Sequence, residues 1–303
     1  MIANLFSHAL FLSYFDLRSV LKWLLQQPHP TMAPSPGSSV SPEVLYTHFR
    51  TTFRSRKMEP LAVAVHAVSS LGNFTANQSI AVFGCGPVGL LCMAVAKALG
   101  AARIIAIDVQ ESRLEFAKTY FKGGVQLDTY VPVAKQDSET TVEYSMRNGA
   151  NMKKVLGIED QGPKSVDLVV DASGAETCIQ TSFYVAKTRG CVVQLGIGAF
   201  FVTLDLSMVL LKELVFRGSF RYGPGDYALA IALTSQGKVD VKPLITHRYP
   251  FTSALEAFKA VQSGEKGLVK AVISGPGVDV DDNWSDEDGE LIRLLSQCSR
   301  VSA

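Results

Sequence analysis

IAVFGCGPVGLLCMAVAKALGAARIIAID, residues 80–108, is the stretch that decides the fold of this chain. A short apolar run ends at Gly84, a helical pattern opens at Gly86 and Gly89, and a second apolar run ends at Asp108. In a strand–turn–helix unit the first glycine permits the tight turn, the second lets the backbone approach a pyrophosphate, and the third lets helix and strand pack closely. The free N–H groups at the start of the helix favour phosphates. The stretch therefore predicts a dinucleotide-binding turn.

Asp108 indicates which dinucleotide this turn would take. It ends the second predicted strand, about 20 residues beyond the glycines, where a carboxylate accepts hydrogen bonds from the hydroxyls of an adenosine ribose. The same charge opposes a 2′-phosphate, so the sequence favours NAD over NADP. The alternative is a glycine turn in an α/β protein that binds no ligand.

The surrounding sequence alternates strand and helix patterns. Nearly all-apolar runs of this kind are typical of parallel strands covered on both faces. The predicted strands are SIAVFG, RIIAID, SVDLVVDASG, CVVQLGIG and LVFRGSF; the predicted helices cover MEPLAVAVHAVSSLG, which ends at Gly72, and residues 88–99, 111–120, 176–187, 206–211 and 227–236. This order predicts an α/β fold with a doubly wound parallel sheet of the Rossmann type.

Composition narrows the class of protein. A chain of 303 residues with 47% hydrophobic content can bury a large core, as one large domain or as two. The net charge of +1 provides no basic field, so nucleic acid is not expected as a partner. The five cysteines are dispersed, without a CxxC pair, which argues against a disulfide framework and indicates a reducing, cytoplasmic location.

The two ends of the chain differ from its centre. Apolar residues recur at helical spacing near the N-terminus, but Asp16, Arg18 and Lys22 interrupt them, so no membrane span is expected. The segment before Asp16 holds no Lys or Arg, which argues against a signal peptide. A Pro/Ser-rich stretch then predicts a linker up to residue 57. Residues 275–303 include DVDDNWSDEDGE, which is typical of a solvated acidic tail.

Residues 58–274 resemble the zinc-containing medium-chain polyol dehydrogenases, with the greatest similarity to the fungal xylitol (D-xylulose reductase) and sorbitol dehydrogenase group. The motifs that carry the resemblance are MEPLAVAVHAV, FGCGPVGLL, IIAIDVQESRLEFAK, VVDASGAETCIQ, GSFRYGPGDYALAIAL and VKPLITHRYPF. The resemblance implies an NAD-binding Rossmann domain over residues 58–240 and a remnant of a GroES-like catalytic domain over 241–274. Residues 1–57 then form an N-terminal segment foreign to the family.

The resemblance also implies roles for single residues. Asp108 and Arg113 would hold the adenosine ribose, and Val88 would lie beside the pyrophosphate turn. The nicotinamide end would be lined by Leu195, Gly196, Ile197, Ser219, Phe220 and Arg221. Arg221 and Tyr222 would act at the substrate. Arg221 follows an apolar strand at its carboxyl end, where ligands bind in open α/β sheets. The alternatives are a surface ion pair for Arg221 and a turn aromatic for Tyr222.

The sequence differs from this family in its zinc-binding residues. Glu59 matches a family glutamate of the catalytic zinc environment, but no GHE motif and no cysteine precede Cys85. His8, His29 and His48 are isolated, without the clustered donors of a tetrahedral site. His66 is expected to be a helix-packing residue and Cys85 a small packing residue. We therefore expect little zinc on a chain that lacks most of the family's zinc domain.

Two classes of function remain open from the sequence. One is an NAD-dependent polyol dehydrogenase by descent, which converts a secondary alcohol of a small polyol to a ketone by hydride transfer, with zinc stabilising the alkoxide. The other is a catalytically inactive NAD-binding Rossmann module. By the resemblance, this module would still associate as a homo-oligomer through the family's dimer surface, at the edge strand around ELVFRGSF.

Overall fold

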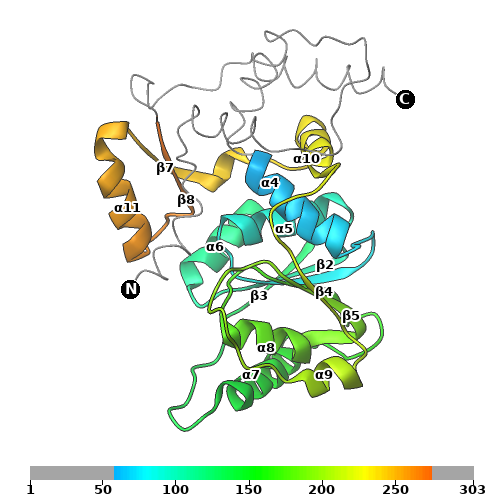
Figure 1. The fold of residues 1–303 in the computed structure, drawn as a ribbon. Coiled ribbons are helices and arrows are strands. Elements are labelled where there is room, and N and C mark those ends of the chain that lie inside the picture. Colours follow the sequence, from blue (N-terminus) through cyan, green and yellow to red (C-terminus); the bar gives the residue numbers. More distant parts are fainter. Residues whose placement is uncertain (1–57, 275–303) are drawn as a thin grey trace, which may run out of the picture. The chain divides into compact units, whose positions relative to one another are not determined.

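A six-stranded parallel sheet forms the centre of the described residues, with helices on both faces (Figure 1). The computed structural model describes residues 58–274. The strand order is β3-β2-β1-β4-β5-β6. The strands are β1 Ser79–Phe83, β2 Arg103–Ile107, β3 Gln126–Tyr130, β4 Val166–Asp171, β5 Ala186–Gln194 and β6 Val215–Gly218. This order confirms the predicted doubly wound α/β fold.

The helices cover the sheet in two layers, one on each face. They are α4 Met58–Val65, the π-helix η1 His66–Leu71, α5 Pro87–Ala98, α6 Glu111–Tyr120, α7 Thr141–Leu156, α8 Glu176–Val185, α9 Leu206–Leu211 and α10 Asp226–Ser235. α4, α5, α6 and α10 share one core with the sheet, while α7 and α8 share the other. Successive residues of one strand point to opposite faces: in β1, Ile80 and Val82 enter the first core, and Ala81 and Phe83 the second.

Residues 242–273 carry a second, two-stranded sheet. It consists of β7 Ile245–Tyr249 and β8 Lys270–Ile273, which pair in parallel and are joined through the short helix η3 Phe251–Ser253 and α11 Ala254–Ser263. The helical turn η2 Lys242–Leu244 precedes β7, and Leu244 and Val269 pack against the first core. The interpretation of residues 241–274 as a catalytic-domain remnant, and the boundary at residue 240, remain proposals.

Most of the predicted elements are present, with shifts at their ends. The helix predicted to run to Lys187 ends at Val185, and strand β5 begins directly afterwards at Ala186. Buried Lys212 donates from its Nζ to the carbonyl oxygens of Tyr184 and Ala186, so it satisfies carbonyl groups left free at this helix end. β3 and α7 were not among the predicted elements, and the predicted single helix up to Gly72 changes to a π-helix at His66.

Several sequence interpretations lie outside the described residues. These are the N-terminal segment 1–57 with His8, His29 and His48, the acidic tail 275–303 and Cys298. Between residues 58 and 274, no helix is both long enough and apolar enough to cross a lipid bilayer. The four cysteines in this range are free thiols, with Cys85 and Cys92 buried.

Candidate functional site

The residues predicted to bind a dinucleotide follow the carboxyl ends of neighbouring strands. The strand register aligns the last residues of the six strands in one row: Tyr130, Ile107, Phe83, Asp171, Gln194 and Gly218. Asp108, Gly84 and Leu195 come directly after three of them, and Ser219 follows the last. The chain order of the strands reverses between β1 and β4, which is the topological switch point where open α/β sheets bind ligands.

The three glycines of the turn meet different surroundings. Gly84 has a φ of +93°, which favours glycine. A Cβ on Gly89 would lie 1.8 Å from the Gly84 carbonyl oxygen, so only glycine allows helix α5 to pack this close to the turn. A Cβ on Gly86 would meet no atom within 4 Å. Gly86 is therefore not needed for packing, and it leaves open space at the first residue before α5.

Asp108 is buried against the glycine turn. Its Oδ2 accepts a hydrogen bond from the Cys85 N–H at 2.8 Å, and its Oδ1 accepts one from the Gln110 N–H at 2.9 Å. The Arg113 guanidinium lies 3.5 Å from Oδ2. Since each carboxylate oxygen has about two acceptor positions, Asp108 can hold the turn and still accept further hydroxyl groups. Its side chain is thus part of the turn as well as a candidate ribose ligand.

Two predicted residues near this turn have buried side chains. Val88 belongs to the first core, so its backbone N–H at the start of α5 is the group available to a phosphate. Burial, together with the neighbouring Asp108 carboxylate, raises the pKa of the Cys85 thiol well above its ordinary range. The prediction that Cys85 is a packing residue and not a nucleophile agrees with this environment.

Asp171 is a buried carboxylate at the switch point that the sequence analysis missed. Its Oδ1 accepts the Ser173 hydroxyl at 2.6 Å, and its Oδ2 accepts the Gly174 N–H at 3.0 Å. Burial raises its pKa, against the pull of these hydrogen bonds. It therefore fixes the 172–174 turn, whose backbone lies beside Gly84. The signal that would have found it is an acid directly after the apolar run of VVDASG.

The loop of Leu195, Gly196 and Ile197 lies against this second turn. The N–H groups of Leu195 and Gly196 both donate to the Asp171 carbonyl, at 2.9 and 2.7 Å. A Cβ on Gly196 would lie 2.2 Å from the Gly174 nitrogen, so a side chain does not fit here. Ile197 is exposed. The loop is held by backbone contacts and presents one apolar side chain outward.

Ser219 and the residues after it directly follow the carboxyl end of β6. The Ser219 N–H donates to the Gln194 carbonyl at 2.8 Å. Ser219 Oγ and Gln194 Oε1 are buried polar atoms without a hydrogen-bond partner within residues 58–274. Such atoms are rare because each costs about 1–3 kcal/mol, so they indicate a position where a ligand or water would bond.

Arg221 and Tyr222 lie in the turn that leads into α10. Arg221 has a φ of +58°, and its guanidinium lies 5.4 Å from the centre of the exposed Phe220 ring. Among residues 58–274 no carboxylate lies within ion-pair distance of Arg221, and its role stays a prediction. Tyr222 packs edge-on against Tyr227, with ring centres 4.7 Å apart, which also fits the turn-aromatic interpretation.

Within residues 58–274, the surroundings of Glu59 do not supply the donors of a zinc site. Glu59 is the second residue of α4, and loss of water around its carboxyl raises its pKa, while the Lys270 and Arg221 cations act in the opposite direction. Residues 58–274 contain no cluster of three His, Cys, Asp or Glu side chains, whereas a structural or catalytic zinc needs three or four such donors. His66 instead bonds Asp226 on α10, in agreement with the predicted helix-packing role.

Two cavities lie near the amino ends of the strands, away from the candidate dinucleotide site. One of about 280 Å³ is lined by Ser79, Arg103 and Gln126, at the amino ends of β1, β2 and β3. The other, of about 210 Å³, is lined by Lys187, Val215 and neighbouring residues. At the carboxyl ends of the strands, we expect Asp108 and Arg221 to flank one continuous cleft, with Gly86 between them along the dinucleotide.

Comparison with known proteins identifies relatives over most of the described residues. The model of the zinc-binding dehydrogenase family matches residues 87–236. D-xylulose reductase A of Aspergillus niger is 44% identical over 218 residues, which are 72% of this chain and 56% of that protein. D-xylulose reductase A of Aspergillus oryzae is 43% identical over 221 residues, with 73% and 56% covered. The chain thus spans little more than half the length of these curated relatives.

Solved structures give the same result for the fold. L-idonate 5-dehydrogenase from Escherichia coli aligns with a TM-score of 0.56 at 26% identity, covering 73% of this chain and 56% of that one. 2R,3R-butanediol dehydrogenase from Bacillus subtilis aligns with a TM-score of 0.59 at 24% identity, covering 73% and 57%. These structural matches show the fold. The family model and the 44% identity to the D-xylulose reductase of Aspergillus niger over 72% of this chain show that the chain carries a zinc-binding dehydrogenase domain.

Proposed function

We propose that this chain binds NAD across the carboxyl edge of its sheet and is by descent an NAD-dependent polyol dehydrogenase. The observation that carries the proposal is the buried Asp108 carboxylate, which bonds the glycine turn and keeps acceptor capacity at the end of β2. If NAD were held here, it would supply hydride-transfer chemistry, with the hydride of a secondary alcohol accepted by the nicotinamide and the hydroxyl proton released to solvent. The names of the curated relatives, D-xylulose reductase A, support D-xylulose and its polyol as the substrate class.

Different residues of the site bind different parts of the dinucleotide. Asp108 and Arg113 bind the adenosine ribose, while the N–H groups at the start of α5, beside Gly86, bind the pyrophosphate. From β2 to β6 the sheet crosses four strand spacings, or about 19 Å, which is enough for an extended dinucleotide. The loop of Leu195 to Ile197 and the residues Ser219 to Tyr222 bind the nicotinamide end, with Arg221 and Tyr222 next to the substrate.

A second candidate function is an NAD-binding module without catalysis. It is favoured by the lack of a metal-binding cluster in the described part of the chain and by the cationic neighbours of Glu59. Glu59 alone does not hold zinc well, so no chemical step is assigned to the metal here. The two candidates share the dinucleotide site and differ in turnover.

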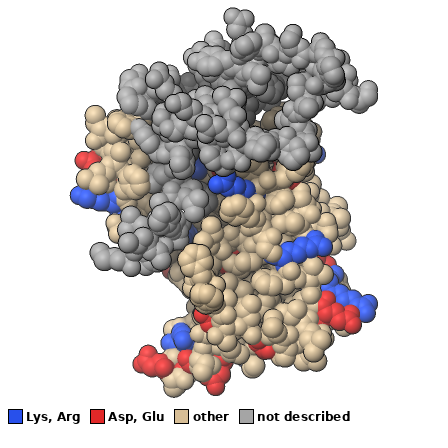
Figure 2. Space-filling view, in the orientation of Figure 1, with Lys and Arg blue, Asp and Glu red and all other residues tan. Residues whose placement is uncertain are grey.

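We also propose a homo-oligomer and a cytoplasmic location. β6 is an edge strand of the described sheet, and exposed apolar side chains surround it, which supports pairing with a second copy. The free cysteines support a reducing compartment. On the face shown in Figure 2 the Lys and Arg side chains are scattered, and we propose neither nucleic acid nor a membrane as a partner.

Titration of the purified chain with NADH and NADPH, followed by nucleotide fluorescence, tests the cofactor proposal. We expect NADH to bind more tightly by at least about tenfold, or 1.4 kcal/mol, and Asp108→Ser to reduce this preference. Equal affinities, or tighter NADPH binding, would contradict the assignment of Asp108.

Metal analysis and turnover separate the two candidate functions. For the chain alone we expect less than one zinc per molecule and little NADH formation with xylitol or sorbitol, because the described donors do not form a zinc site. Full zinc occupancy with robust turnover would favour the active dehydrogenase.

A further inference from the structure

We infer that Asp226 is a positioning residue that fixes the 221–225 turn, and with it Arg221, at the nicotinamide end of the site. The inference rests on the proposed function for its consequence, but its geometry is independent of any ligand. Asp226 is the first residue of α10 and is almost completely buried, with 2% of its surface exposed. A buried carboxylate is stable only when its oxygens are bonded, and Asp226 finds three donors.

These donors come from two distant parts of the chain. Asp226 Oδ2 accepts the Gly223 N–H at 2.6 Å and lies 2.7 Å from His66 Nδ1. Its Oδ1 accepts the Ser70 hydroxyl at 2.6 Å. His66 and Ser70 belong to η1, about 160 residues earlier in the chain. The carboxylate thus ties the 221–225 turn to a helix that is itself packed in the first core.

The helix that supplies these donors is unusual. η1 is a π-helix over six residues, and its end is closed by a hydrogen bond from the Gly72 N–H to the Ala67 carbonyl, five residues back. π-helical turns are rare and recur at functional sites. Here the widened turn carries both side chains that bond Asp226, His66 at its start and Ser70 near its end.

The turn that Asp226 holds is conformationally strained. Arg221 has a φ of +58° although it is not glycine, and Gly225 has a φ of +90°. A residue such as arginine keeps a left-handed conformation only where its surroundings impose it. Two contacts besides the Gly223 bond restrict the turn. Tyr222 packs edge-on against Tyr227, and Gly223 lies so close to η1 that a Cβ on it would be 3.4 Å from His66 Cε1.

The consequence for binding is local. The Asp226 network touches neither the glycine turn nor Asp108, so its loss should free Arg221 and leave the adenosine end unchanged. ADP-ribose contains the adenosine, the pyrophosphate and the second ribose but no nicotinamide. Comparison of NADH with ADP-ribose therefore distinguishes a misplaced 221–225 turn from a general loss of folding.

The experiment uses the full chain and three variants. Asp226→Asn removes the charge that bonds His66, and Ser70→Ala removes a single hydrogen bond from a less buried residue. Asp167→Asn is the matched control, because Asp167 accepts the Ser79 N–H at 2.7 Å and pairs with Lys187 at the opposite edge of the sheet. For each variant the dissociation constants of NADH and ADP-ribose are measured, together with the rate of trypsin cleavage after Arg221.

We expect Asp226→Asn to weaken NADH binding about tenfold, to leave ADP-ribose binding within about twofold, and to speed cleavage after Arg221. Ser70→Ala should change the same readouts in the same direction by a smaller factor, which keeps the test valid if Asp226→Asn does not fold. Asp167→Asn should leave the cleavage rate and the ratio of the two affinities unchanged.

Other results would overturn the inference. It is wrong if both ligands weaken equally in Asp226→Asn and Ser70→Ala, if neither affinity changes, or if Asp167→Asn has the same effect. Failure of the natural chain to bind either ligand contradicts the proposed function instead. In that case unchanged cleavage after Arg221 in the variants would show that Asp226 does not hold the turn either.

Discussion

At the scale of single residues, two glycines of the turn have different roles: Gly89 is needed for packing and Gly86 is proposed to be needed for binding. We predict that Gly89→Ala destabilises the chain by about 2–3 kcal/mol or more, because its Cβ would lie 1.8 Å from the Gly84 carbonyl oxygen. Gly86→Ala is the matched variant: its Cβ meets no atom within 4 Å and its φ is −72°. It should keep the stability of the natural chain and lose NADH affinity.

Urea unfolding and NADH titration of both glycine variants check this prediction. A stable Gly89→Ala protein would contradict the packing argument. Unchanged NADH binding by Gly86→Ala would contradict the placement of the pyrophosphate beside this residue.

The same scale shows which site residues a sequence can reveal. Gly84, Gly89 and Asp108 are joined by hydrogen bonds and close contacts within about 25 residues, and a local motif describes them well. Asp226 depends on His66 and Ser70, about 160 residues away. No local spacing encodes that pairing, since it follows from how α10 packs on α4 and η1. From the sequence alone, Asp226 is recognisable only as an acidic residue at the start of a helix.

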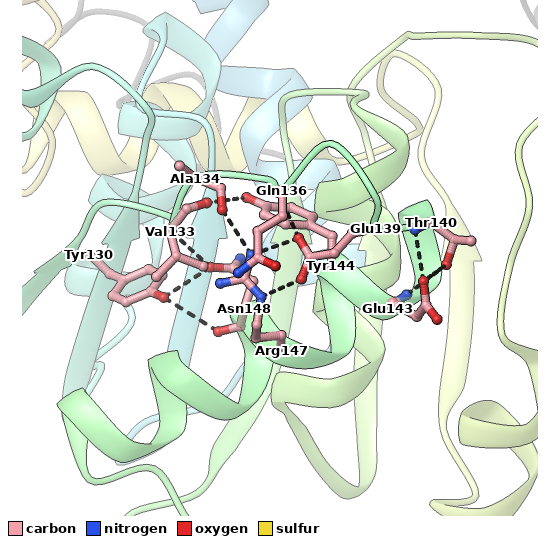
Figure 3. A network of polar contacts seen from close by, with 10 residues as sticks. All are labelled: Tyr130, Val133, Ala134, Gln136, Glu139, Thr140, Glu143, Tyr144, Arg147 and Asn148. Atoms are coloured by element: carbon pink, nitrogen blue, oxygen red, sulfur yellow. Dashed lines mark hydrogen bonds and ion pairs between the residues drawn. The ribbon is translucent and has the colours of Figure 1, made fainter.

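At the scale of elements, the segment after β3 is fixed to α7 by a polar network (Figure 3). The Arg147 guanidinium donates to Glu139 at 2.7 Å and to the Ala134 carbonyl at 2.8 Å. Thr140 and Glu143 form a capping box at the start of α7. This network gives the loop its structure without any apolar core of its own.

The Glu139 carboxyl makes this segment sensitive to acid. Hydrogen bonds from Arg147, and then from the Gln136 N–H, lower its pKa from 4.5 to about 2. A carboxyl with a lowered pKa stabilises the fold above its ordinary pKa, and that contribution is lost as the pH falls from 4.5 towards 2. We therefore predict that the natural chain exceeds Glu139→Gln in stability at pH 7, and that the difference disappears near pH 2.

Urea unfolding at several pH values measures this difference. Glu115→Gln, which removes an exposed pair with Lys118 on α6, is the control. A difference between the natural chain and Glu139→Gln that stays constant from pH 7 to pH 2 would refute the assignment.

Lys212 stabilises the end of helix α8, although it lies about 27 residues later in the chain. Its ammonium bonds the Tyr184 and Ala186 carbonyls and lies 2.8 Å from Asp160, although burial lowers its pKa. We predict that Lys212→Met lowers the free energy of unfolding by about 2–3 kcal/mol, because it leaves these acceptors unpaired. Lys154→Met on the exposed side of α7 should change it by less than about 0.5 kcal/mol, and equal effects would contradict the role of Lys212.

The elements that the sequence did not reveal have physical reasons for being missed. β3, QLDTY, is an edge strand with a mostly half-exposed surface, so it lacks the continuous apolar run of the central strands. α7 is polar on average and contains Gly149 in its interior. Its capping box, Thr140 to Glu143, was the available signal. The central strands β1, β2 and β4, by contrast, are buried on both faces, and their apolar runs predicted them. β5 begins at Ala186, five residues before its predicted apolar run.

At the scale of the whole molecule, cofactor binding and stability are linked. A ligand that binds only the folded state raises the free energy of unfolding by about 2.7 kcal/mol at 100 times its dissociation constant. We predict a rise of this size with NADH and a smaller one with NADPH at the same concentration. Thermal unfolding with each nucleotide measures it, and Asp108→Ser should bring the two shifts together; identical shifts in the natural chain would exclude the proposed discrimination.

The surface around β6 carries the exposed apolar residues on which the proposed homo-oligomer rests. Leu210 and Leu211 on α9 are more than 70% exposed, and Val215 on β6 itself is 41% exposed. The edge of β6 offers backbone groups that a second copy can pair, and pairing two such edges about a two-fold axis buries the same apolar residues on both copies.

We predict that the natural chain is a dimer and that Leu210→Glu combined with Leu211→Glu converts it to a monomer. Four carboxylates would be brought into one interface, and burying unpaired charge costs more than the apolar contacts supply. Because both leucines are exposed in the single chain, the stability of the monomer should be preserved. Val155→Glu, an exposed apolar residue on α7, is the matched control and should leave the dimer intact. Sedimentation velocity distinguishes the two states, and a monomeric natural chain, or equal dissociation by the control, would reject β6 and α9 as the interface.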